Sequence, residues 1–94
     1  GERVLWSQMT FKVEWSDNSL AQLRKLEGLL VKRIIRKVKD FSQTPFLGDV
    51  KRLKGLESYR LRIGDYRVIF DSDHQTQTIK IAKVGHRKNI YDSL

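Results

Sequence analysis

The most informative stretch of the sequence is residues 59–70, YRLRIGDYRVIF. Apolar side chains occupy every second position on each side of a central Gly64-Asp65 pair, and arginines stand among them. The apolar positions are Tyr59, Leu61, Ile63, Tyr66, Val68 and Phe70. Such alternation is typical of half-buried strands, and a two-residue Gly-Asp segment is typical of a tight hairpin turn. The stretch therefore predicts a β-hairpin with one apolar face and one basic face.

Two further strands are predicted from the same kind of pattern. Residues 78–84 place Ile79 and Ile81 on one face, after a polar turn at residues 71–75. Residues 10–15 also alternate, with three large apolar side chains on one face. A meander of three strands and one separate N-terminal strand follow from these patterns.

Residues 16–45 predict two helices. Residues 16–19 hold Ser, Asp and Asn, which are good N-caps, and leucines then recur at helical spacing. Gly28 marks the break between the helices, and residues 42–45 end the second one, because proline and the residue before it resist helix. The buried stripe expected on the second helix consists of Val31, Ile34, Ile35, Val38 and Phe41.

The predicted order is β-α-α-β-β-β, an α+β fold in which two N-terminal helices pack on one face of an antiparallel sheet. The chain has 94 residues, enough for one domain. We expect residues 1–8 to be a tag or a disordered extension and residues 9–94 to form that domain. The chain has no cysteine and no apolar run near the roughly 20 residues that span a bilayer. We therefore expect a soluble, cytoplasmic protein.

The charge balance favours a polyanionic partner. Nineteen lysines and arginines stand against 11 acidic residues, which gives a formal net charge of +8. The excess lies mainly in the second half: residues 50–67 hold six cations and two anions, and residues 80–91 hold four cations and no anion. Nucleic acid is the commonest partner of such a surface, through phosphate contacts. A generic basic protein remains the alternative at this point.

The arginines of the hairpin are candidates for a phosphate site. Arg60 and Arg62 share one face of a strand, since side chains repeat every second residue. Arg67 follows just across the hairpin turn, within cross-strand reach. Guanidinium groups bind phosphate bidentately, so we rank a phosphate site above a merely solvated basic face.

A second cluster, GHRKNIY, covers residues 85–91 and follows the last strand. With the strand arginines it suggests metal-independent cleavage of RNA, in which a ribose 2′-hydroxyl attacks the adjacent phosphorus. That reaction needs a proton acceptor, stabilisation of the developing charge and a proton donor. Arginine is a poor base, so His86 is the best proton shuttle and Tyr91 the second. We expect no metal and no cofactor, and we interpret His74, which lies among turn acids, as part of a hydrophilic turn.

At these motifs the chain resembles the RelE/ParE toxin superfamily of prokaryotic toxin–antitoxin systems. The motifs are LKG at residues 53–55, YRLR at 59–62, GDYR at 64–67 and GHRKNIY at 85–91. The resemblance extends over residues 9–94 and implies the same strand–helix–helix–three-strand order. It implies a small toxin that binds the ribosomal A site, cleaves the messenger RNA there, and is blocked by a cognate antitoxin.

The resemblance also implies site residues. Two active-site lysines of the RelE branch correspond to Arg60 and Arg62, and further active-site positions correspond to Arg67, Arg87 and Tyr91. Arginine is a much weaker proton acceptor than lysine, and we therefore hypothesise that His86 takes the acceptor role. Eight further cations are expected to form the RNA and ribosome footprint: Lys51, Arg52, Lys54, Lys83, Lys88, Lys32, Arg33 and Arg36.

Three alternatives stay open. The ParE branch has the same fold but inhibits DNA gyrase without cutting nucleic acid. An inactive toxin homologue would only bind antitoxin. A plain RNA-binding module would bind RNA tightly without breaking the strand.

Overall fold

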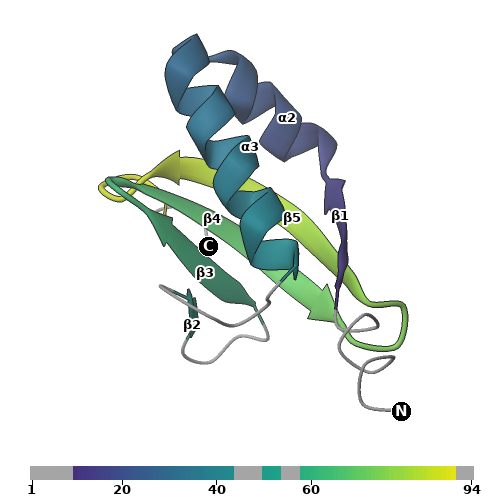
Figure 1. The fold of residues 1–94 in the computed structure, drawn as a ribbon. Helices are drawn as coiled ribbons and strands as arrows, with labels where there is room; N and C mark the ends of the chain where they lie inside the picture. The colour runs from purple at the N-terminus through teal and green to yellow at the C-terminus, as the bar shows by residue number, and fades with distance from the viewer. Residues whose placement is uncertain (1–9, 44–49, 54–57, 91–94) are drawn as a thin grey trace.

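Two helices lie against one face of a five-stranded sheet (Figure 1). The computed structural model describes residues 10–43, 50–53 and 58–90. The expectation for residues 1–8 and those for Lys54 and Tyr91 lie outside the described residues. The elements are β1 (Lys12–Trp15), α2 (Asp17–Arg24), α3 (Gly28–Gln43), β2 (Val50–Arg52), β3 (Tyr59–Ile63), β4 (Tyr66–Asp73) and β5 (Thr78–His86). The predicted α+β fold with two helices on one face is confirmed.

The sheet has the strand order β1-β5-β4-β3-β2. The three pairs from β2 to β5 are antiparallel, as tight connections require, but β1 runs parallel to β5. The prediction of a wholly antiparallel sheet is therefore wrong for this pair. No short turn constrains the direction of β1, because most of the chain separates it from β5, and so long a connection permits parallel pairing. Strand β2 is an addition that the sequence pattern did not predict.

The two helices begin and end where their local chemistry dictates. The Ser16 side chain caps α2, since its Oγ accepts a hydrogen bond from the Ser19 backbone N–H at 3.0 Å. The expected break falls just before Gly28, which is the first residue of α3. On α3 the side chains of Ile34 and Val38 are buried, whereas Ile35 is 44% exposed. Ile35 was expected in the buried stripe, but the sheet contacts a narrower strip of the helix than the sequence pattern covers.

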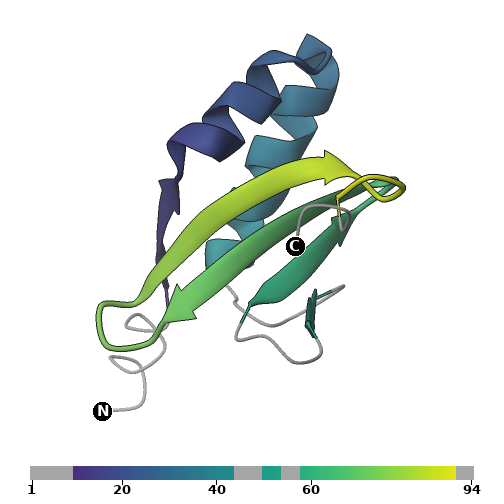
Figure 2. The ribbon, with the colours of Figure 1, turned by 180° about the vertical axis from the view of Figure 1, so that it is seen from behind.

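The core fills the space between α3 and the sheet. Phe70 of β4 lies at its centre, 5.2 Å from the ring of Phe41 and 5.5 Å from the ring of Tyr59. Other buried members come from the same sides of the strands: Leu61, Ile63, Val68, Ile79, Ile81 and Val84. Because side chains alternate across a strand, the residues between them in β3 and β4 face away from the helices. Figure 2 shows the sheet from that second face.

The β3–β4 hairpin turns on Gly64. Its φ is +59°, a left-handed conformation that glycine adopts without strain, and Asp65 follows with an ordinary negative φ. This combination is what a two-residue turn with glycine first requires. The turn brings Arg62 and Arg67 opposite each other.

No helix among the described residues is both long enough and apolar enough to cross a membrane.

Candidate nucleic-acid interface

A basic groove of about 710 Å³ lies on the face of the sheet that the helices leave uncovered. Its walls come from β2, β3, β4 and the turn after β5. The lining residues are Lys51, Arg52, Leu53, Arg60, Arg62, Arg67, Arg87 and Lys88. Seven of these eight carry a positive charge, and none of the described lining residues is acidic. We refer to it below as the basic groove.

Strand register explains why these cations meet. Lys51 of β2 is the direct partner of Arg60 in β3, and Arg62 of β3 is the direct partner of Arg67 in β4. The side chains of direct partners lie on the same face, about 5 Å apart at Cβ. Segments distant in the sequence thus place their charges side by side. The groove contains four of the six expected catalytic residues, all of them arginines.

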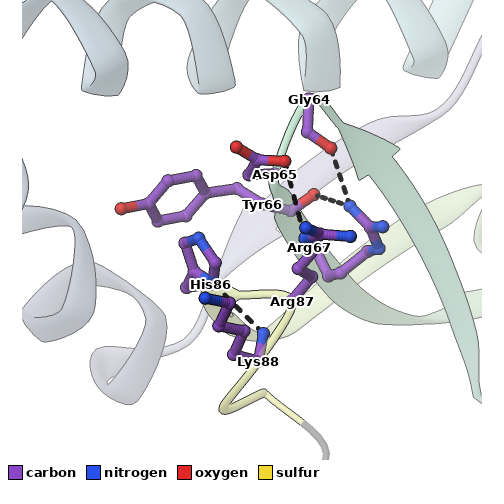
Figure 3. Close-up of polar contacts among 7 residues, drawn as sticks. All are labelled: Gly64, Asp65, Tyr66, Arg67, His86, Arg87 and Lys88. Atoms are coloured by element: carbon purple, nitrogen blue, oxygen red, sulfur yellow. Dashed lines mark hydrogen bonds and ion pairs between the residues drawn. The ribbon is translucent and has the colours of Figure 1, made fainter.

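Two uncharged backbone groups hold the Arg67 guanidinium group in place, and these contacts do not neutralise its positive charge. Its Nη1 donates hydrogen bonds to the backbone carbonyl oxygens of Gly64 and Tyr66, both at 2.9 Å (Figure 3). Carbonyl oxygens orient the guanidinium group but carry no formal charge. The Arg67 side chain is only partly exposed, so its orientation is fixed before any ligand arrives. A pre-oriented, uncompensated guanidinium is suited to an anion.

Arg87 is held by Asp65 of the hairpin turn. The Arg87 backbone N–H donates to the Asp65 carbonyl oxygen at 2.8 Å, and the Arg87 Nε lies 3.5 Å from the Asp65 carboxylate (Figure 3). Both side chains are exposed, so the ion pair itself contributes little stability. Asp65 was not among the expected site residues, although its place in the hairpin turn was a signal available in the sequence.

His86 is not among the residues that line the basic groove. It pairs with Tyr66 across β4 and β5, and the two rings meet edge to face at 5.3 Å. Tyr66 packs against the helix-side core, so the imidazole lies on the face opposite the arginines. Figure 3 shows the His86 ring beside Tyr66. The structure therefore does not bring together His86 and the groove arginines.

A β-bulge explains this position. Between the pairs Ile69–Lys83 and Phe70–Ile81, Ala82 has no opposite residue in β4. A single extra residue reverses the alternation of every side chain beyond it. Without the bulge, the pattern set by Ile79 and Ile81 would place His86 on the basic face.

The expected footprint residues are divided between two layers of the molecule. Lys51, Arg52 and Lys88 line the basic groove, and Lys83 lies next to Ile69 on the same face without lining it. The helix residues line a separate hollow of about 420 Å³ on the other side of the molecule. That hollow is formed by Lys32, Arg33, Arg36, Lys37 and Asp40.

The turn at residues 74–77 shows no metal-type arrangement. His74 contacts the ring of Phe11 edge to face at 5.7 Å. Across the described ranges, no group of three or more His, Cys, Asp or Glu side chains is arranged to hold a metal ion.

The chain matches one family model, described as the ParE toxin of the type II toxin–antitoxin system parDE, over residues 13–91. No curated protein sequence matches it significantly.

Several solved structures have the same fold. The toxin–antitoxin complex RelBE2 from Mycobacterium tuberculosis contains a chain that is 25% identical, with a TM-score of 0.75 over 83% of this chain and 99% of that one. The archaeal RelE–RelB complex from Pyrococcus horikoshii is similar at 29% identity and a TM-score of 0.73, over 84% of this chain and 97% of that one. The intact RelBE complex of E. coli matches at 18% identity and a TM-score of 0.70, over 81% and 95% of the two chains. This last likeness shows the fold alone.

The family match covers most of the chain, and it agrees with the helix–sheet arrangement and with the motifs that form the basic groove. The resemblance to these toxins is thereby confirmed: the chain belongs to the RelE/ParE family of type II toxin–antitoxin toxins.

Proposed function

We propose that this protein is a metal-independent endoribonuclease that binds the ribosomal A site and cleaves the messenger RNA there, inhibiting translation. The main support for this proposal is the basic groove. Seven cations from four segments line it, and none of its described lining residues is acidic. Such a groove favours a phosphodiester backbone strongly and distinguishes poorly among bases.

The proposed chemistry is in-line attack of a ribose 2′-hydroxyl on the adjacent phosphorus. The 2′-hydroxyl gives up its proton to an acceptor, the bond to the 5′-oxygen breaks as the new bond forms, and the leaving 5′-oxygen takes up a proton from a donor. Negative charge accumulates on the phosphoryl oxygens between the two. Arg67, held by two carbonyl oxygens, and the neighbouring guanidinium groups of Arg62 and Arg87 are assigned to stabilise that charge. Arg60 and Lys51, which are direct strand partners, extend the phosphate contacts toward β2.

His86, the proton acceptor expected from the sequence, does not line the basic groove. The His86 ring lies away from the groove, and the arginines are too basic to accept a proton at neutral pH. Lys51 and Lys88 are the side chains other than arginine that could exchange a proton with a substrate in the groove, which makes them the candidates within it.

The proposed protein partner is a cognate antitoxin. The similar chains of Mycobacterium tuberculosis and Pyrococcus horikoshii were solved as toxin–antitoxin complexes. An acidic or phosphate-mimicking segment of an antitoxin that occupied the basic groove would block RNA from the same cations.

The test is a cell-free translation reaction with purified protein, followed by mapping of new 5′ ends on a defined messenger. We expect breaks within codons at the A site, only when ribosomes are present. Arg67→Ala should abolish the breaks. Arg24→Ala is the matched control, because Arg24 is exposed in the last turn of α2 and outside the groove.

Circular dichroism of both variants separates loss of activity from loss of fold. An intact messenger with the wild-type protein, at a concentration that arrests growth in cells, would refute the nuclease proposal.

The matching family model is described as a ParE toxin, and the resemblance to the ParE branch implies the second candidate, inhibition of DNA gyrase without cleavage of nucleic acid. A supercoiling assay with purified gyrase separates the two. Inhibition of supercoiling together with an intact messenger would support this candidate in place of the first.

A further inference from the structure

The turn that follows β5 carries two of the seven cations of the basic groove, Arg87 and Lys88. Both side chains are exposed, and the turn comprises residues 87–90. Arg87 and Lys88 add their charges to the groove only while the turn keeps this conformation. The contacts that hold the turn therefore decide where these two cations stand.

Three backbone N–H groups of the turn bond to one residue, His86. The N–H groups of Asn89 and Ile90 donate to the His86 carbonyl oxygen, both at 2.9 Å. The Lys88 N–H donates to the His86 ring at Nδ1, at 3.1 Å. Only an unprotonated ring nitrogen can accept this bond. The His86 side chain thus holds the first part of the turn, at Lys88, and the His86 carbonyl oxygen holds the rest, at Asn89 and Ile90.

The imidazole is itself held from the other side. Its ring packs edge to face against Tyr66 at 5.3 Å, with an interplanar angle of 78°. Tyr66 is the direct strand partner of His86 and packs against the core. The ring therefore has a fixed orientation, and Nδ1 is aimed at the Lys88 N–H (Figure 3).

We propose that His86 is a positioning residue: its Nδ1 fixes the turn that presents Arg87 and Lys88 to RNA phosphate, and its ring takes no part in proton transfer. The inference rests on the proposed function in treating the basic groove as a phosphate site. It explains why a histidine on the opposite face of the sheet accompanies the groove cations.

Asparagine offers a sharp test, because its Oδ1, like the histidine Nδ1, is bonded to Cγ and so lies two bonds from Cβ. Asparagine side chains accept from the N–H two residues ahead in the Asx turn, which is the bond seen here. His86→Asn therefore keeps the acceptor and removes the imidazole ring. His86→Phe keeps a ring against Tyr66 and removes the acceptor. His86→Leu takes its place if the Phe variant does not fold.

Two measurements do not depend on cleavage. The first is hydrogen exchange of the Lys88 backbone amide by NMR. The second is binding of a single-stranded oligodeoxynucleotide, which lacks the 2′-hydroxyl and stays intact, at a series of salt concentrations. We expect His86→Asn to keep the protection of the Lys88 amide and the salt dependence of binding. We expect His86→Phe to lose the protection and to lower the slope of log K against log salt by up to about 1.4, or about 0.7 for each displaced cation.

The cleavage assay adds a third readout. Under the proposal His86→Asn cleaves with the pH profile of the wild-type protein and His86→Phe cleaves poorly. Equal losses in both variants, or a pH limb that vanishes in His86→Asn, would overturn the proposal in favour of a chemical role for the ring. Unchanged Lys88 protection in His86→Phe would also overturn it. If the wild-type protein does not cleave RNA, the amide and binding measurements still decide the role of His86.

Discussion

Arg62 and Arg67 are direct partners across the β3–β4 hairpin, and both line the basic groove. Like charges directly opposite each other in a sheet repel and are destabilising. The repulsion disappears when an anion lies between the two guanidinium groups. The two arginines therefore favour an anionic ligand at this point of the basic groove.

The first prediction concerns the salt dependence of nucleic-acid binding. Replacing Arg67 by Gln should lower the slope of log K against log salt for a single-stranded oligonucleotide by about 0.7, the value for one lost phosphate contact. Fluorescence anisotropy at four or more salt concentrations measures the slope. Arg24→Gln, outside the groove, should leave it unchanged; an equal effect of both variants would mean that binding follows net charge and not the groove.

The second prediction compares two adjacent isoleucines of α3. Ile34 is fully buried and Ile35 is 44% exposed. Ile34→Ala should lower the free energy of unfolding by about 2–5 kcal/mol through lost burial and a cavity, whereas Ile35→Ala should cost less than about 1 kcal/mol. Urea denaturation of both variants tests this. Similar losses would place Ile35 in a buried interface.

The third prediction compares two glycines. Gly64 has a φ of +59°, so Gly64→Ala should cost about 1–2 kcal/mol in strain. Its added Cβ would also lie 3.4 Å from Nη2 of Arg33. Gly28 begins α3 with open space around it, so Gly28→Ala should be neutral or stabilising by up to about 1 kcal/mol. Thermal unfolding distinguishes the two, and a harmless Gly64→Ala would contradict the hairpin conformation.

The fourth prediction concerns pH and Asp73, at the end of β4. Hydrogen bonds from the backbone N–H groups of Thr76, foremost, and Gln75 lower the pKa of the Asp73 carboxyl below its ordinary value. A lowered folded-state pKa means that the contribution of Asp73 to stability is present above the unfolded pKa of about 3.9 and is lost as the pH falls through the folded value. Asp73→Ala should therefore be less stable than wild type at pH 7, and the difference should shrink in acid.

Urea denaturation at pH 7 and near pH 3 measures that difference. A gap between Asp73→Ala and wild type that stays constant over this range would show that the carboxylate does not hold the turn.

The hairpin at residues 59–70 followed from the sequence by itself. Its signals are local: alternation at every second residue, a Gly-Asp turn, and arginines that share a face because of the alternation. The same local rules predicted the cap of α2 among residues 16–19, of which Ser16 is the one used, and the division of the helical region at Gly28. Neighbours along the chain determine such features, so no tertiary contact is needed to predict them. Arg60, Arg62 and Arg67 of the basic groove were predictable in the same way, whereas Arg87 was expected only from the family resemblance.

Only the tertiary structure decided the direction of β1, the exposure of Ile35 and the side of the sheet on which His86 lies. The last of these depends on Ala82, whose carbonyl oxygen accepts hydrogen bonds from the Ser16 hydroxyl at 3.0 Å and from the Asn18 side chain at 3.3 Å. These contacts join β5 to the start of α2, more than 60 residues earlier in the chain, at the one residue that β4 leaves unpaired. A bulge at a single position reverses every later side chain. The spacing of Ile79, Ile81 and Val84 changes phase at this point, but the phase change alone does not say which residue is left unpaired. The sequence therefore determined which residues carry a positive charge or an imidazole ring. Long-range contacts decided which of these side chains lie close together.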